Sequence, residues 1–222
     1  TTETYTLSLH DALPISGGGR PLAPTRVQIV DSSVVTPRSG NNSLKLEGGQ
    51  RAGVTLAWGT PPGTDVQVKW WARVPASVQG TTATYLRMSL YGVEGTSAYA
   101  GDKALLGYGS RDATIGDATS LTYYNGAWLD TGVDYTPDVW EEYAVITHNS
   151  DGQYSIIKNP SSATPTVIVD KAPYIGTAPT WGPTFMVAWS SSNGSGHPPV
   201  YLDDIEITSF GLPSFSDRKS VV

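Results

Sequence analysis

Residues 66–74 read VQVKWWARV and alternate between apolar and polar side chains. Successive side chains of an extended strand point to opposite faces, so this segment has one apolar face and one polar face. The predicted inward face consists of Val66, Val68, Trp70, Ala72 and Val74. The predicted outward face consists of Gln67, Lys69, Trp71 and Arg73. This pattern is typical of an antiparallel strand that packs on a core with one face and meets solvent with the other.

The rest of the chain repeats this strand pattern. Residues 84–92 alternate in the same way, with Leu86, Met88 and Leu90 predicted inward and Tyr85, Arg87 and Tyr91 outward. Gly and Pro separate short β-branched and aromatic runs, and no helical periodicity stands out. Asn125-Gly126 and Asp151-Gly152 are hairpin signals between such runs. The sequence therefore predicts an all-β protein built from antiparallel strands.

The two ends of the chain look foreign to this pattern. Residues 6–15 resemble the translation of a common sequencing-library adaptor, and residues 217–222 resemble its reverse complement. We interpret 1–16 and 217–222 as adaptor-derived and 17–216 as a single β-sandwich domain from a metagenome fragment. We expect both ends to lie outside the sandwich, unpaired with its central strands. The native start is then missing, so a signal peptide would not be visible.

The composition excludes several classes of function. The formal net charge is −6, with 20 acidic and 14 basic residues, which argues against a nucleic-acid partner and mildly against a polyanionic sugar. No run of apolar residues is long enough to span a membrane, so no membrane insertion is expected. The chain has no Cys, few charged residues and many Trp, Tyr and Gly residues, which is typical of secreted or extracellular β-proteins.

Three local strings resemble one family. Thr36–Gly40 with the following Ser43–Glu47, Trp140 with the later Asp151–Tyr154, and Tyr201–Ile207 resemble strands of the concanavalin A-like lectin/glucanase (laminin G-like jelly-roll) superfamily. The resemblance implies an antiparallel two-sheet jelly-roll sandwich. Because this fold carries lectins, binding modules, glucanases and polysaccharide lyases, it does not by itself decide the function.

An enzyme of this family would need identifiable catalytic residues. The glucanase pattern Glu-x-Asp-x-Glu is absent, and the adjacent pairs Glu141-Glu142 and Asp203-Asp204 are predicted to point to opposite faces of a strand. A polysaccharide lyase would use Tyr and His as acid and base, with an Arg beside the uronate. Tyr85, Arg87, Tyr91 and His148 could share a sheet face for that purpose, although the Arg-rich and Gln-x-His strands of such lyases are not recognisable.

A binding site requires less, because sugars pack their C–H faces on aromatic rings beside polar groups. The predicted carbohydrate-binding residues are Trp71, Arg73, Tyr85, Arg87, Tyr91 and His148. We therefore expect an extracellular, non-catalytic module for carbohydrate binding or adhesion, whose partner is a polysaccharide or another glycan. A polysaccharide lyase or another glycan-active enzyme is the alternative, and a structural domain without a ligand is a third class.

Two expectations accompany this interpretation. A loop or a second layer could cover the outward face, in which case its rings are simply core, and Trp58, Trp70, Trp140 and Trp189 are predicted to be core. No cofactor is expected other than a structural calcium ion held by Asp203 or its neighbour. The alternative for Asp203 is a hydrogen-bonded carboxylate at a strand bulge.

Overall fold

A computed structural model describes residues 2–7, 27–47, 53–59, 65–75, 86–91, 102–109, 115–175, 184–191 and 198–210. Fourteen β-strands and no helix are found in these ranges, so none of their segments is a helix that could cross a membrane. The strands are β1 (Thr2–Leu7), β2 (Val27–Asp31), β3 (Asn42–Leu46), β4 (Gly53–Gly59), β5 (Asp65–Arg73), β6 (Leu86–Tyr91), β7 (Asp102–Tyr108), β8 (Ser120–Tyr124), β9 (Trp128–Asp134), β10 (Trp140–His148), β11 (Gln153–Lys158), β12 (Thr166–Pro173), β13 (Thr184–Ser191) and β14 (Val200–Phe210). The predicted all-β class is confirmed.

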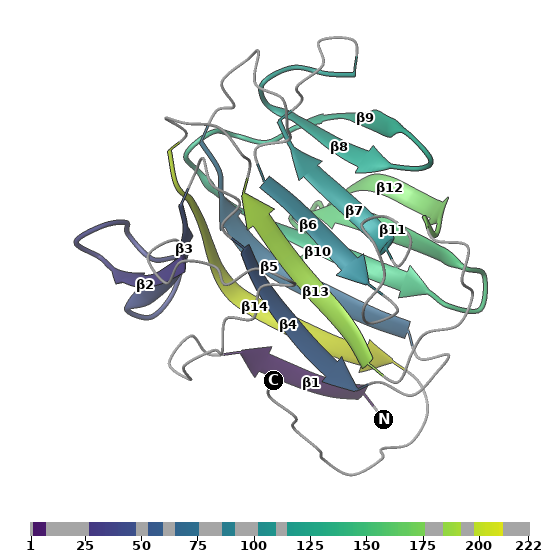
Figure 1. Cartoon of the computed structure of the whole chain (residues 1–222), viewed down its shortest axis with the longest axis horizontal. Helices are drawn as coiled ribbons and strands as arrows, with labels where there is room; N and C mark the ends of the chain where they lie inside the picture. The colour runs from purple at the N-terminus through teal and green to yellow at the C-terminus, as the bar shows by residue number, and fades with distance from the viewer. Residues whose placement is uncertain are drawn as a thin grey trace.

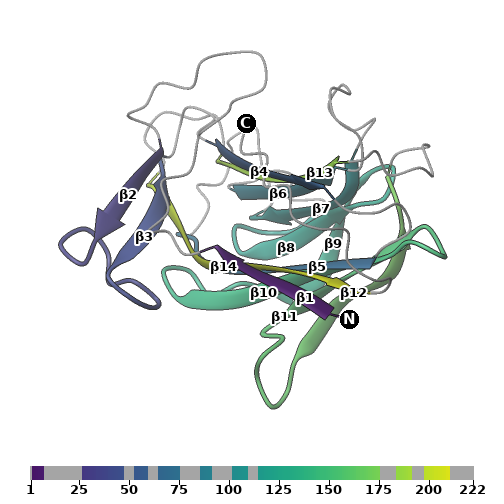
Figure 2. The ribbon, with the colours of Figure 1, turned by 90° about the horizontal axis from the view of Figure 1, so that it is seen from below.

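The strands form two antiparallel sheets that pack face to face (Figures 1 and 2). Sheet A has eight strands in the order β12-β11-β10-β5-β14-β3-β2, with β1 added beside β14. Sheet B has six strands in the order β4-β13-β6-β7-β8-β9. The order does not follow the sequence, because the last long strand lies between β5 and β3. This arrangement confirms the predicted two-sheet sandwich.

Strand β5 lies at the centre of sheet A, between β10 and β14. Its predicted inward residues, from Val66 to Val74, are all buried, whereas Lys69, Trp71 and Arg73 are partly exposed. The alternation in VQVKWWARV therefore separates the core face of sheet A from its outer face, which points away from sheet B.

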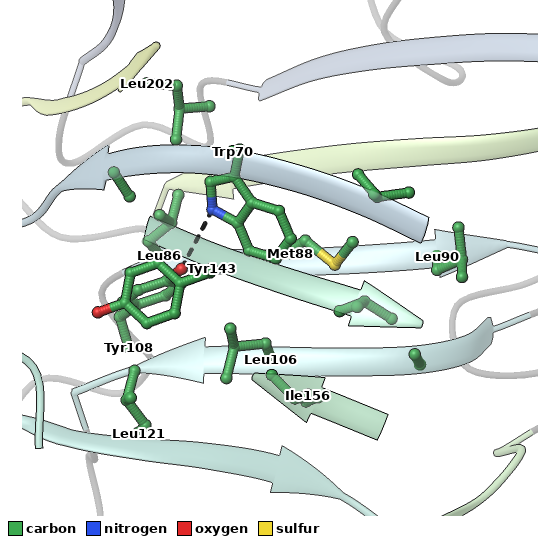
Figure 3. Packing of buried hydrophobic residues seen from close by; sticks show 14 of the residues in the cluster. Trp70, Leu86, Met88, Leu90, Leu106, Tyr108, Leu121, Tyr143, Ile156 and Leu202 are labelled. Atoms are coloured by element: carbon green, nitrogen blue, oxygen red, sulfur yellow. Dashed lines mark hydrogen bonds between the residues drawn. The ribbon is translucent and has the colours of Figure 1, made fainter. Parts of the chain in front are cut away.

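Three aromatic rings join the two sheets in the core (Figure 3). Trp70 of β5 stacks on Tyr143 of the neighbouring β10, with 6.0 Å between ring centroids, and its Nε1–H donates to the hydroxyl of Tyr108 at 3.2 Å. Tyr108 belongs to β7 of sheet B and meets Tyr143 edge-on at 5.0 Å. Burial raises the pKa of Tyr108 and of Tyr143 well above the ordinary value of a tyrosine. The two polar groups thus remain neutral and bonded inside the core.

Both predicted hairpins are present. Gly126 has a φ of 78° in the turn between β8 and β9, and Gly152 has a φ of 65° in the turn between β10 and β11. Glycine adopts such left-handed conformations without the steric cost that a Cβ atom would bring. These turns set the register of the strands that they connect.

The expectation that both ends stay unpaired is wrong for the N-terminal strand. Thr2–Leu7 pairs antiparallel with Ile205–Phe210 of β14, which is an inner strand of sheet A (Figure 1). The physical reason is an available edge. Strand β3 pairs with Val200–Leu202 of β14, so the backbone beyond them can accept an extended segment on that side. Residues 8–16 and 217–222 lie outside the described residues.

The loop between β2 and β3, residues 32–41, contacts the outer face of sheet A, and we call it the strap. Trp140 of β10 donates its Nε1–H to the carbonyl oxygen of Thr36 at 2.9 Å. The guanidinium carbon of Arg38 lies 4.1 Å from the centroid of the Trp71 ring. The expectation that a loop could cover the outward face is therefore met in part, because one face of Trp71 carries a cation–π contact.

Asp203 holds the strap at a bulge in the register between β14 and β5. Its Oδ2 accepts hydrogen bonds from the backbone N–H of Arg38 at 2.9 Å and from the Ser43 hydroxyl at 3.0 Å. Its Oδ1 accepts from the backbone N–H of Asp204 at 2.9 Å. Asp204 has a φ of 44° and accepts from the Ser39 hydroxyl at 2.5 Å. The two carboxylates thus tie the strap to sheet A.

Replacement of the two adjacent tryptophans should have very different effects on stability. Trp70→Ala leaves a cavity in the core and is expected to cost about 3–5 kcal/mol of unfolding free energy. Trp71→Ala removes a cation–π contact on the outer face and should cost about 1 kcal/mol or less. Urea unfolding of both variants measures the difference, and equal losses would contradict the assignment of faces.

Removal of the Asp203 carboxylate should also destabilise the protein. Asp203→Ala leaves the buried Ser43 hydroxyl and the backbone N–H groups of Arg38 and Asp204 without their acceptor, which should cost about 1–3 kcal/mol. Asp204→Asn is the matched control, because asparagine tolerates positive φ and keeps an acceptor oxygen, and it should change stability by less than about 0.5 kcal/mol. Thermal unfolding compares the two variants. An Asp203→Ala protein as stable as the parent would show that the strap does not depend on this carboxylate.

Candidate functional site

The predicted binding residues do not form one surface. Trp71 and Arg73 lie on β5 of sheet A, whereas Arg87 lies on β6 of sheet B, where Leu86 and Met88 face the core. The outer faces of a sandwich point in opposite directions, so the predicted single aromatic face is wrong. Alternation identifies the polar face of each strand but not the sheet to which the strand belongs.

The remaining members of the predicted set are scattered or outside the described part of the chain. Tyr85 lies outside the described residues, and only the backbone of Tyr91 is described, in β6. His148 is in β10 of sheet A and shares a 2.9 Å hydrogen bond between its Nε2 and the Ser155 hydroxyl. The prediction that His148 shares a sheet face with Arg87 for lyase chemistry is therefore wrong.

His148 is also far from Trp71 on its own sheet. Glu142 of β10 lies opposite Trp71, and His148 follows six residues later on the same strand. At about 3.3 Å per residue this corresponds to roughly 20 Å. His148 and Trp71 thus lie too far apart to contact one sugar ring.

A cluster of aromatic and cationic residues does form around Arg73 on the outer face of sheet A. Arg73 lies directly opposite Trp140 of β10 and directly opposite Tyr201 of β14. All three side chains are partly exposed, as is Trp71, two residues before Arg73. We call Trp71, Arg73, Trp140 and Tyr201 the outer patch. Three adjacent strands position it, and the strap lies along it.

Two members of the outer patch were not predicted. Trp140 was expected in the core, but Tyr143 of β10 is buried and Trp140 lies three positions earlier, so it belongs to the opposite face. Tyr201 was missed as a candidate, although the buried Leu202 beside it marks its neighbour as outward-facing. The core prediction for Trp70 is confirmed, whereas the side chains of Trp58 and Trp189 lie outside the described set.

The guanidinium of Arg73 is the unusual group in the outer patch. Its Nε is buried and has no hydrogen-bond partner. Within the ranges that the structure describes, no carboxylate forms an ion pair with Arg73. A second cation, Arg38, lies over Trp71 on the same face. This part of an acidic protein therefore presents positive charge between aromatic rings.

The adjacent glutamates point to opposite faces, as predicted. Glu141 faces inward, accepting from the Tyr143 hydroxyl at 2.7 Å and pairing with Lys158 at 3.0 Å. Glu142 faces outward and accepts from the backbone N–H and the hydroxyl of Ser161, both at 2.9 Å. Each carboxylate is held by its own neighbours. The pair does not have the shared orientation that a retaining glycosidase needs.

The Asp203 carboxylate is hydrogen-bonded and lies at a strand bulge. This is the arrangement predicted from the sequence as the alternative to a calcium ligand. Burial raises the pKa of Asp203, while hydrogen bonds from Asp204 and Arg38 act in the opposite direction. Both of its oxygens already accept from the chain. Among the described residues, no group of three or more acidic or histidine side chains is arranged to hold a metal. The structural calcium ion stays a prediction.

Sheet B offers a second set of aromatic rings. Tyr124 of β8 and Trp128 of β9 meet edge-on with 5.6 Å between ring centroids, and both are partly exposed. Thr122, two residues before Tyr124, has a buried hydroxyl without a hydrogen-bond partner. The outer patch combines a guanidinium with two flanking rings, which suits sugar binding better than a ring pair alone. Trp128 is therefore a suitable control position.

No family model matches the sequence, and no curated protein matches it. The fold, however, is similar to several solved structures. A peanut lectin in complex with a nonapeptide has a TM-score of 0.54 at 10% identity, over 96% of this chain and 100% of that one. The catalytic domain of a glycoside hydrolase family 131 protein from Coprinopsis cinerea has a TM-score of 0.52 at 12% identity, over 87% and 80%.

A sialidase has a TM-score of 0.52 at 7% identity, and the match covers 82% of this chain but 17% of the sialidase. Lectins and glycoside hydrolases thus share this architecture, and the fold is compatible with either activity. With its two antiparallel sheets and these structural relatives, the chain has the concanavalin A-like jelly-roll fold that the sequence predicted.

Proposed function

We propose that this protein is an extracellular, non-catalytic carbohydrate-binding or adhesion module, and that its binding site is the outer patch. The observation that carries the proposal is the row formed by Trp140, Arg73 and Tyr201 across three adjacent strands. Aromatic rings bind the apolar C–H faces of sugars, and a cationic donor between them fixes the orientation of hydroxyl groups. The lectin fold of the structural relatives is consistent with this function.

The outer patch is held in place before any ligand arrives. The hydrogen bond to Thr36 fixes the Trp140 ring, and Arg38 packs on one face of Trp71. Asp203 anchors the strap from which both contacts come. Binding to an ordered surface loses less conformational entropy than binding to one that must first become ordered. This favours a binding role for the patch over a purely structural one.

Catalysis on the same scaffold, by a polysaccharide lyase or a glycoside hydrolase, is the alternative that the fold permits. The state of the three buried carboxylates in the described ranges favours binding. Glu141 pairs with Lys158, Glu142 accepts from Ser161, and Asp203 accepts from three donors of the chain. Acid and base residues need access to a substrate, which these groups do not have.

Retention on polysaccharide gels should depend on the outer patch. Trp140→Ala and Tyr201→Ala are expected to weaken retention on the best-bound polymer at least tenfold, about 1.4 kcal/mol each. Trp128→Ala is the matched control, because it removes a partly exposed ring from sheet B. Affinity electrophoresis measures all three variants. If Trp128→Ala lowers retention and Trp140→Ala does not, the site is on sheet B and the proposal is wrong.

The same polymers also test the non-catalytic role. Prolonged incubation with the parent protein should produce neither new reducing ends nor the ultraviolet absorbance of unsaturated uronates. Either signal, provided that it persists after repurification of the protein, would replace the binding module with an enzyme.

A further inference from the structure

From the state of Arg73 we infer that the outer patch binds the carboxylate of an acidic sugar, a uronate residue of a polysaccharide. This inference rests on the proposed function and names the class of ligand. It starts from a guanidinium that is partly buried, flanked by two aromatic side chains and not neutralised within the described part of the chain. A partly buried charge without a counter-ion is costly, and an anionic ligand would remove that cost.

The nearby carboxylates are already committed to other donors. Asp203 accepts from the backbone and from Ser43, and Asp204 accepts from Ser39. Glu142, on the neighbouring strand, accepts from Ser161 and lies 3.9 Å from the ammonium of Lys69. The acidic groups around Arg73 therefore have partners elsewhere.

A second cation adds to the charge of the patch. Arg38 projects over Trp71, whereas Lys45 of β3, directly opposite Tyr201, is paired with Glu47 and adds no net charge. The chain as a whole carries a net charge of −6, so positive groups gathered on one face are not a consequence of its composition. A surface of this kind favours an anionic partner over a neutral one.

A carboxylate suits the guanidinium of Arg73. A guanidinium binds planar carboxylates through two parallel N–H···O bonds, which adds both strength and orientation. Trp140 and Tyr201 lie on the two strands that flank Arg73, where they can pack against the sugar ring that carries the carboxylate. The aromatic rings would then bind the apolar face of the uronate, and Arg73 would bind its acid group.

The test uses pairs of polymers that differ only in charge. Polygalacturonate, alginate and hyaluronan are each compared with the carboxyl-reduced form of the same polymer, in which the uronate has become a neutral hexose. The parent protein should bind at least one acidic polymer at least tenfold more tightly than its reduced form. The preference should shrink as salt is added, because exposed charges are screened.

Variants of Arg73 test whether this residue causes the preference for the acidic polymer over its reduced form. Arg73→Gln should lower binding of the acidic polymer to the level of its reduced form, and Arg73→Lys should keep only part of the preference, since the ammonium lacks the planar fork. Lys171→Gln is the control for the same change in charge, because its side chain is 55% exposed and lies on β12 at the edge of sheet A. It should leave both affinities unchanged.

The thermal stability of the same variants separates binding from a structural role. Among the described residues, no carboxylate pairs with the Arg73 guanidinium and its Nε has no hydrogen-bond partner, so Arg73→Gln should melt at or above the temperature of the parent protein. A clear loss of stability would point to a structural role for Arg73 and overturn the inference.

The binding results separate the two proposals. Equal affinity for acidic and reduced polymers, with binding still dependent on Trp140, would overturn the uronate inference and leave the carbohydrate-binding proposal intact. A protein that binds none of these polymers and no neutral glycan would overturn both.

Discussion

The alternation of side chains along β5 decides which of its residues enter the core and which lie on the outer face of sheet A. Trp70 and Trp71 are neighbours in the sequence, yet they face opposite sides of sheet A because successive side chains of a strand must do so. Trp70 enters the core, stacks on Tyr143 and donates to Tyr108 of the opposite sheet. A shift of one residue in the register would bury charged side chains and expose this ring. The core therefore determines which face of sheet A is available for function.

The outer face gains its chemistry from segments that are distant in the sequence. Trp140 and Tyr201 come from the strands on either side of Arg73, and Arg38 comes from the strap that Asp203 anchors. At the bulge, Asp203 accepts from the backbone N–H of Arg38 and the adjacent Asp204 accepts from the Ser39 hydroxyl, so both carboxylates bind the strap. No carboxylate in the described part of the chain pairs with Arg73, and the nearby Asp203 and Asp204 accept hydrogen bonds from the strap instead. Because these carboxylates bind the strap, Arg73 is the group that we propose to bind the carboxylate of the ligand.

Much of the fold could be predicted from local patterns, because periodicity and turn chemistry act over a few residues. The faces of β5, the hairpins at Gly126 and Gly152, and the opposite orientation of Glu141 and Glu142 are all of this kind. The site could be predicted only in part. The alternation in the sequence shows that Trp71 and Arg73 face outward. That Arg87 belongs to the other sheet depends on strand order, which the local sequence does not show.

The remaining differences have the same origin in long-range pairing. The contact between Thr36 and Trp140 joins residues more than a hundred positions apart, and no local pattern announces it. The sequence predicts Trp140 in the core because it precedes an apolar strand. However, it is three positions from the buried Tyr143 and therefore lies on the outer face of sheet A. The pairing of β1 with β14 depends on an open strand edge, which the local sequence of residues 2–7 does not reveal.

If the ligand binds on the outer face of sheet A, the indole N–H signals of the seven tryptophans will report it. Nitrogen-15 NMR spectra, assigned with single Trp→Phe variants, are recorded during titration with a uronate oligosaccharide. We expect the Trp140 and Trp71 signals to shift, while Trp70 in the core and Trp128 on sheet B stay in place. A shift of Trp128 with unchanged Trp140 and Trp71 signals would place the ligand on sheet B instead.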